Sequence, residues 1–209
     1  MAQVLATRQR RASRISAWPL AASALLMVAA TFVPDQPLGA QDLDERLTQS
    51  REAVKSFGER LRGELQAAMQ AGGPVGAVEV CQSMAQEIAA YESRRRGWRI
   101  GRTSLRVRNP ANAPDDWELE VLRLFEARKA AGQDPTMLEY HGEATAPDGS
   151  RLFRYMKAIP TAELCTACHG RDVAPEVRAV ILDRYPEDRA TGFAVGDLRG
   201  AFTIIQPLD

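Results

Sequence analysis

Cys165-Thr166-Ala167-Cys168-His169 is a C-x-x-C-H sequence, and it is the stretch around which the fold is organised. Two thiols one helical turn apart can add to the two vinyl groups of a haem, and the histidine that follows directly can bind the iron. The spacing therefore predicts one covalent haem c per chain. In this interpretation Cys165 and Cys168 form the thioethers, and His169 is the proximal axial ligand.

Two other kinds of site use the same residue types. A zinc ion could be held by three cysteines and one histidine. The residues available for it are Cys81, Cys165, Cys168 and either His169 or His141. A thioredoxin-type dithiol would lie early in a βαβ unit, whereas this motif comes late and follows a strand-like run. We therefore favour the haem and keep a zinc-binding structural module as a less favoured alternative.

The composition is that of an ordinary globular domain. Of the 209 residues 26% are charged and 45% are hydrophobic, which is enough for one domain with a real core. The formal net charge is zero, because an excess of basic residues in 1–40 balances an acidic excess in the remainder. A mildly acidic body has no clustered basic face, so we exclude nucleic acid as a partner.

The first forty residues have the pattern of a secretion signal. Arginines without any acidic residue precede an apolar run at 18–33, which is shorter than the ~20 residues of a membrane-spanning helix. Small residues then predict cleavage after Ala40. We expect a signal peptide at 1–40 and a single periplasmic haem domain at 41–209. Because Leu38 occupies a position where signal peptidases prefer a small residue, an uncleaved inner-membrane anchor remains an alternative.

Helical periodicity dominates the first half of the remaining chain. Apolar residues recur at steps of three and four from Asp42 to Ala68, which predicts a long amphipathic helix ending at Gly72-Gly73-Pro74. We expect it to cover the core of its own domain, with a homodimer through this helix as the alternative. A second helix is predicted from about Val75 to Ser93, with Cys81 in its apolar stripe.

The second half alternates between strands and short helices. Asp115 or Asp116 is a predicted helix cap, and Pro147-Asp148-Gly149 is a turn signal between two strand-like runs. Helices first and antiparallel strands later indicate an α+β fold. The expected elements are a strand at 97–103, a loop at 109–115, a helix at 116–131, a hairpin of strands at 137–144 and 151–159, a helix at 174–185 and a strand at 200–207.

Several short motifs together carry a resemblance to a known family. They are VEVC (78–81), GRTSL (101–105), RNPAN (108–112), FRYM (153–156), CTACHG (165–170), TG (191–192) and GDLRGA (196–201). In combination they resemble exported single-haem c-type domains with a PAS-like fold, which occur alone or as sensor inputs of histidine kinases. The resemblance spans roughly residues 42–208. It implies a PAS-like antiparallel sheet with a long N-terminal helix and flanking helices.

The same resemblance implies the axial ligands of the haem. They would be His169 on one side of the iron and Cys81 on the other. From the residues alone, Cys81 could also be a buried spectator or form an intermolecular disulfide. His141 and Met156 are competing ligands, although a strand position and a core position suit them better.

Three arginines lie just before the Asn109-Pro110 loop. Arg102, Arg106 and Arg108 could hold the haem propionates through paired hydrogen bonds, or they could form a solvated basic face. The chain shows no kinase or other output module, so we expect any signal to pass to a redox or signalling protein partner.

We expect a haem-binding, cytochrome-like protein of the cell envelope that is not an enzyme and that senses redox state or a diatomic gas. In such a sensor a ligand such as NO or CO would replace Cys81 on reduction. The alternative is a low-potential periplasmic electron carrier, which keeps both ligands. Peroxidase catalysis needs an open site and a distal acid-base residue, for which His141 would be the remaining histidine, and we favour it least.

Overall fold

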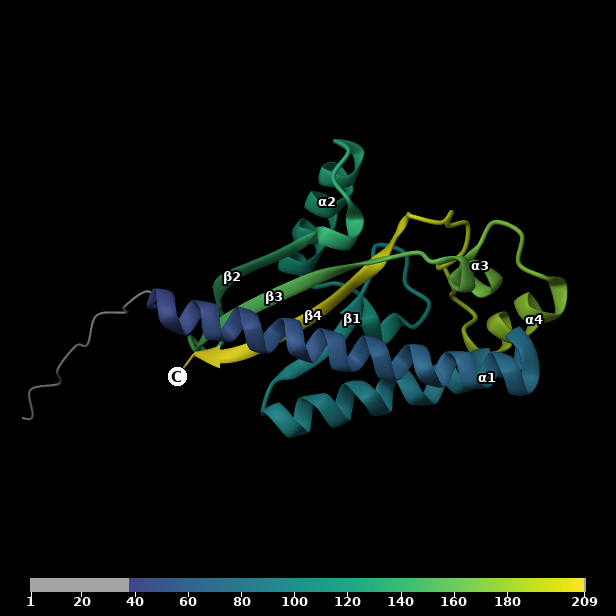
Figure 1. Cartoon of the computed structure of the whole chain (residues 1–209), viewed down its shortest axis with the longest axis horizontal. Coiled ribbons are helices and arrows are strands. Elements are labelled where there is room, and N and C mark those ends of the chain that lie inside the picture. Colours follow the sequence, from purple (N-terminus) through teal and green to yellow (C-terminus); the bar gives the residue numbers. More distant parts are fainter. Residues whose placement is uncertain (1–37, 209) are drawn as a thin grey trace, which may run out of the picture. The chain divides into compact units, whose positions relative to one another are not determined.

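A four-stranded antiparallel sheet forms the middle of the fold, with strand order β1-β4-β3-β2 (Figure 1). The computed structural model describes residues 38–208, except the side chain of Val80. The helices are α1 (Ala40–Arg96), α2 (Asp116–Ala130), α3 (Glu163–His169) and α4 (Pro175–Arg184), with short 3-10 turns η1 (Pro110–Asn112) and η2 (Pro135–Met137). The strands are β1 (Arg99–Thr103), β2 (Glu139–Thr145), β3 (Arg151–Pro160) and β4 (Leu198–Leu208). This is the expected α+β fold with a long N-terminal helix.

Helix α1 is a hairpin of two helical segments. At Gly73 the backbone has φ 61° and ψ −164°, a conformation open to glycine but strained for residues with a Cβ, and Pro74 follows. The first segment (40–72) and the second segment (74–96) run side by side in opposite directions (Figure 1). Ser56 Oγ donates to Glu92 Oε1 across them at 2.8 Å. The break predicted at Gly72-Gly73-Pro74 is therefore confirmed.

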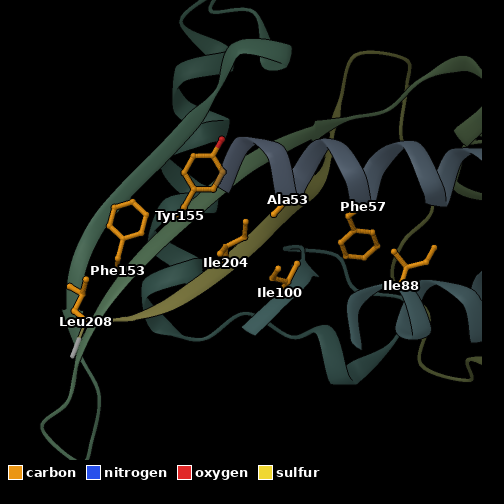
Figure 2. Close-up of a cluster of buried hydrophobic side chains, with 8 residues drawn as sticks. All are labelled: Ala53, Phe57, Ile88, Ile100, Phe153, Tyr155, Ile204 and Leu208. Atoms are coloured by element: carbon orange, nitrogen blue, oxygen red, sulfur yellow. The ribbon is translucent and has the colours of Figure 1, made fainter. Parts of the chain in front are cut away.

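One face of the sheet packs against the α1 hairpin (Figure 2). Phe153 and Tyr155 lie two residues apart in β3 and so point to the same face. The buried cluster on this face comprises Ala53, Phe57, Ile88, Ile100, Phe153, Tyr155, Ile204 and Leu208. The apolar stripe of the first segment thus covers the core of its own domain, as expected, while a homodimer through this helix stays a prediction.

A second buried cluster joins α2 to β3 and β4. Helix α2 begins with a capping box, in which the Asp115 side chain accepts from the Glu118 N–H and the Glu118 carboxylate accepts from the Asp115 N–H. The cluster comprises Val121, Leu122, Phe125, Leu138, Met156, Ala158, Leu198 and Ala201. Met156 is fully buried among these residues, which agrees with a core position.

A third, smaller cluster positions the C-x-x-C-H motif. Val78 of the second segment packs against Val177 and Ile181 of α4, and Cys168 of α3 packs against the same group. Helix α3 begins just after β3 ends, and the chain returns to the sheet only at β4. The motif therefore sits where β3 leaves the sheet, held against the second segment of α1 (Figure 1).

The ends of several elements differ from the expected positions by one to three residues, and three further differences concern the kind of element. The predicted loop at 109–115 contains η1, where Asn109 Oδ1 accepts from the Ala111 N–H. The first strand of the hairpin begins at Glu139 rather than Met137, because η2 occupies Pro135–Met137. Residues Glu163–His169 form a helix, whereas the sequence pattern alone predicts no element there.

The predicted export signal falls almost entirely on residues that the structure does not describe. Residues 1–37 lie outside the described part, so the signal peptide at 1–40 stays a prediction. Within residues 38–208, no helix is both long enough and apolar enough to cross a membrane.

Candidate functional site

Helix α3 presents Cys165 and Cys168 on one side. Residues three apart in a helix are neighbours on its surface, and both thiols are half-buried. The helix starts with the Cys165 N–H donating to the Ala162 carbonyl at 2.9 Å. It ends with the Gly170 N–H donating to the Thr166 carbonyl at 2.8 Å. The short helix thus gives the two thiols the relative placement that two thioether bonds require.

Gly170 is a position at which a side chain would clash with the backbone of α3. A Cβ on this residue would overlap the Thr166 carbonyl oxygen and lie 3.2 Å from Thr166 Cβ. Gly170→Ala should therefore displace the end of α3, lower the free energy of unfolding by about 1–3 kcal/mol and reduce haem attachment. Urea unfolding and haem staining of the purified chain measure the two effects.

Gly63→Ala is the matched control for that substitution. Gly63 lies in α1, and no atom lies within 4 Å of the Cβ that alanine would add. Because alanine is the better helix former, this variant should be neutral or slightly stabilising. Equal unfolding midpoints for wild type and Gly170→Ala would contradict the steric argument.

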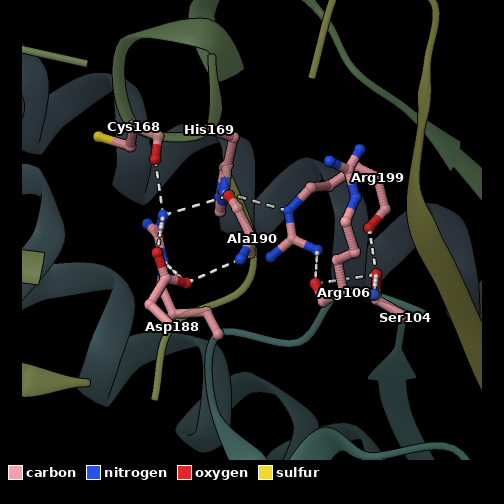
Figure 3. Close-up of polar contacts among 8 residues, drawn as sticks. Ser104, Arg106, Cys168, His169, Asp188, Ala190 and Arg199 are labelled. Atoms are coloured by element: carbon pink, nitrogen blue, oxygen red, sulfur yellow. Dashed lines mark hydrogen bonds and ion pairs between the residues drawn. The ribbon is translucent and has the colours of Figure 1, made fainter. Parts of the chain in front are cut away.

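The His169 ring is held through Nδ1 (Figure 3). Nδ1 lies 2.6 Å from the Ala190 carbonyl oxygen and 3.2 Å from Arg199 Nε. A carbonyl oxygen only accepts, so the shorter contact assigns the proton to Nδ1, which donates to Ala190. Nε2 then carries the free lone pair. This is the tautomer that a histidine needs to bind a metal through Nε2.

The surroundings also keep His169 neutral. Burial lowers the pKa of His169 well below its usual range, and the nearby Arg199 and Arg108 guanidiniums lower it further. The Phe193 ring meets the imidazole edge-on, with ring centroids 6.4 Å apart. A neutral, oriented imidazole is the form that ligates iron.

The segment 188–193 wraps around the end of α3. The Gly192 N–H donates to the Gly170 carbonyl at 2.8 Å, and the Phe193 N–H donates to the His169 carbonyl at 3.0 Å. Asp188 Oδ1 accepts from the Ala190 N–H at 3.0 Å. The carbonyl that orients His169 therefore belongs to a segment fixed by several hydrogen bonds.

The predicted arginines have three different environments. Arg108 donates to Asp188 and, through Nη2, to the Cys168 carbonyl at 2.6 Å. Arg106 stacks on the Phe193 ring, with Cζ 3.6 Å from the centroid. Arg102 is half-buried, and within residues 38–208 it has no carboxylate at ion-pair distance. Arg106 also has no carboxylate at ion-pair distance among the described residues, and Arg102 is the more buried of the two.

Arg199 is a further cation at the site, and the sequence analysis did not single it out as a site residue. Its pKa is lowered to about 9, chiefly by burial and then by repulsion from Arg108 and Arg102. Its Nη1 donates to the Arg106 carbonyl at 3.4 Å. Three guanidiniums thus influence one another around His169, which indicates a site suited to an anionic group.

Cys81 reaches the motif from the second segment of α1. Burial raises the pKa of the Cys81 thiol, and the nearby Arg102 and Arg108 partly oppose this. Burial likewise raises the pKa of Cys168, with Arg108 lowering it and Cys81 raising it. Cys165 also raises the pKa of both these thiols. The fold brings the third thiol to the C-x-x-C-H motif.

The remaining candidate ligands are placed elsewhere. His141 is exposed on β2, where its ring stacks on Phe153 with centroids 6.0 Å apart. Figure 1 shows β2 away from α3. In the described part of the chain, no three His, Cys, Asp or Glu side chains are gathered so that they could hold a metal ion. The zinc alternative therefore finds no ready-made cluster in residues 38–208.

The side chains near the C-x-x-C-H motif have the chemistry that a haem c requires, whereas the cavity nearby does not include the motif. A cavity of about 240 Å³ is lined by residues that include Gln82, Gln86 and Tyr185, but neither Cys81 nor a residue of the C-x-x-C-H motif lines it. The site is instead recognised by the kinds of side chain that it brings together. Two thiols lie on one side of a helix, an imidazole has a free Nε2, and a third thiol lies nearby. Of the nearby cations, Arg108 is paired with Asp188, whereas Arg102 and Arg199 have no carboxylate at ion-pair distance within residues 38–208.

Comparisons with known proteins agree with this fold. The family model described as Tll0287-like matches residues 3–207. The crystal structure of the cyanobacterial heme-protein Tll0287 is similar, with a TM-score of 0.60 and 24% sequence identity. The similarity covers 82% of this chain and 98% of that chain. No curated protein matches the chain.

Proposed function

We propose that this chain, which belongs to the Tll0287-like family, is a haem-binding, cytochrome-like protein of the cell envelope. In this proposal it senses redox state or a diatomic gas and is not an enzyme. The observation that supports it is the orientation of His169, whose Nδ1 contacts the Ala190 carbonyl and whose Nε2 is therefore free. This histidine directly follows two cysteines that lie on one side of a helix. The similar cyanobacterial protein is itself a heme-protein.

Each part of the site has a role in holding the haem c. Cys165 and Cys168 form the thioethers, and His169 Nε2 is the proximal ligand. Cys81 is the distal ligand, and nearby Arg102 and Arg108 would stabilise its thiolate. When bound, the haem supplies a one-electron redox centre and an iron that can take a diatomic ligand.

The propionates are proposed to meet the arginine cluster. Arg102 is the first choice because it is half-buried near Cys81 and, within the described residues, has no carboxylate partner. Arg108 already uses Nε and Nη2 for Asp188 and the Cys168 carbonyl, which leaves Nη1 for a further acceptor. Arg106 is exposed and lies against Phe193, at the edge of the site.

Haem staining after denaturing electrophoresis tests covalent binding. The chain is expressed with a cytochrome c maturation system, and we expect a coloured band that acid-acetone extraction does not bleach. Two thioether bonds survive both treatments, whereas iron ligation alone does not. A colourless chain with stoichiometric zinc would overturn the proposal.

A low-potential electron carrier is the second candidate. The partial exposure of Cys165 and Cys168 favours it, because an electron carrier needs its prosthetic group near the surface. Addition of CO to the reduced protein separates the two functions. A sensor with displaceable Cys81 should form a CO adduct quickly, whereas a carrier that keeps both ligands should not react.

Export to the periplasm is a separate prediction. Cleavage after Ala40 would leave Gln41 as the first residue, at the very start of α1. Leu38 lies against the cluster between α1 and the sheet, and its N–H donates to Glu143 Oε1 at 3.2 Å, so cleavage should remove these two contacts. N-terminal sequencing of the envelope fraction should begin at Gln41 or within a few residues of it. An intact Met1 in the membrane pellet would instead support the anchored alternative.

A further inference from the structure

We propose that the ion pair between Arg108 and Asp188 positions His169 for the iron. The pair would do so by fixing the Ala190 carbonyl on Nδ1 and so selecting the tautomer with a free Nε2. The role of the pair in haem binding rests on the proposed function. The tautomer itself is a property of the protein chain and can be measured whether or not haem is attached.

The pair is buried and has good geometry. Arg108 Nε donates to Asp188 Oδ1 at 3.0 Å, and Nη2 lies 3.4 Å from Oδ2. The side chains are 12% and 3% exposed, respectively. A paired guanidinium and carboxylate in this arrangement define both position and orientation.

The pair joins the two sides of His169. Figure 3 shows Asp188 of this pair next to Ala190, the residue whose carbonyl contacts the imidazole. On one side, Arg108 Nη2 donates to the carbonyl of Cys168, the residue before the histidine, at 2.6 Å. On the other side, Asp188 Oδ1 accepts from the Ala190 N–H at 3.0 Å, and Arg108 Nη2 lies 3.4 Å from the Ala190 carbonyl. One ion pair therefore holds both the backbone that carries the imidazole and the peptide that orients it.

Arg199 makes the consequence specific. Its Nε lies 3.2 Å from His169 Nδ1, and a guanidinium N–H can only donate. If the Ala190 carbonyl moved away, Arg199 would become the nearest partner of Nδ1 and would favour an unprotonated Nδ1. The proton would then be on Nε2, the atom that must bind the iron. Loss of the pair should therefore change the tautomer as well as loosen the loop.

The experiment reads the tautomer by long-range ¹H–¹⁵N NMR on the full chain produced without haem. The chain has two histidines, and a His141→Gln variant assigns the signals. We expect wild-type His169 to carry its proton on Nδ1. Arg108→Ala and Asp188→Ala should each move most of the population to the Nε2–H form. The double variant should move it no further, because both residues act through one contact.

The double variant also protects the test against misfolding. Removing one partner leaves a buried unpaired charge, which is more damaging than removing both. Arg108→Lys and Asp188→Asn are milder versions that lose the paired geometry. If a single alanine variant does not fold, the His169 tautomer is measured in the double variant and in these two milder variants.

The pair between Arg96 and Glu92 is the matched control. Its side chains are 14% and 1% exposed, and it lies at the end of the second segment of α1. Arg96→Ala and Glu92→Ala should lower the urea midpoint to a similar extent and leave the His169 tautomer unchanged. Such a result separates positioning from general stabilisation.

Either of two NMR outcomes would overturn the inference: a wild-type His169 with its proton on Nε2, or variants of the pair that keep it on Nδ1. In the haem-loaded chain, the potential should rise by ~59 mV in each single variant, a tenfold change in relative affinity for the two iron states. An unchanged potential would also count against it. A chain that takes up no haem would defeat the proposed function, while the tautomer would still decide the role of the pair.

Discussion

The double substitution of Cys165 and Cys168 by alanine should abolish covalent haem attachment. The two thiols are the atoms that bond to the haem, and both are half-buried on one side of α3. Each single variant should retain one thioether at most, with a weaker band on haem staining. Staining of the denatured chain and its absorbance after acid-acetone extraction measure the loss. A double variant that stains like wild type would contradict the assignment.

Ala167→Ser is the matched control for these variants. Ala167 lies between the two cysteines, and the substitution keeps their spacing and the histidine unchanged. It should leave haem attachment at the wild-type level. Loss of attachment in this control would mean that the helix, rather than the thiols, limits the reaction.

Cys81→Ala should change the spin state of the ferric protein and raise its potential. A thiolate donates charge and favours Fe(III), so its removal favours reduction. Each ~59 mV of rise corresponds to a tenfold change in the relative affinity for the two iron states. Paramagnetic resonance should show a low-spin thiolate signature in wild type and its loss in the variant. Potentiometry on the same samples measures the rise.

Cys81→Ser separates ligation from packing. Serine nearly keeps the volume of the side chain but cannot supply a thiolate. If Cys81 is a ligand, the serine variant should resemble Cys81→Ala in spin state. A wild type without the thiolate signature, or variants with unchanged spin state and potential, would make Cys81 a spectator. The sensor mechanism would then lose its displaceable ligand.

Local chemistry explains which parts of the fold were predictable. The break in α1 follows from Gly72-Gly73-Pro74, because glycine reaches the required backbone angles and proline cannot continue the preceding helix. The start of α2 follows from Asp115 and Glu118, three residues apart. The boundary errors occur at η1 and η2, where proline begins a short 3-10 turn instead of a loop or strand.

The site was predictable only where neighbouring residues define it. Cys165, Cys168 and His169 form one motif, so their spacing indicates their chemistry. The carbonyl of Ala190 has no sequence signature, since every residue carries a carbonyl. Asp188 meets Arg108 only through folding, across 80 positions of the chain. The arginines could be recognised as cations near a haem motif, but which one is paired depends on tertiary contacts.

Peptide mapping by mass spectrometry tests whether the C-x-x-C-H motif carries the haem. The mature chain is digested after denaturation, and the peptide that contains Cys165, Cys168 and His169 is compared with the peptide that contains Cys81. We expect the mass of one haem on the motif peptide and an unmodified Cys81 peptide. Free thiols at Cys165 and Cys168 in a chain that carries no haem would contradict it.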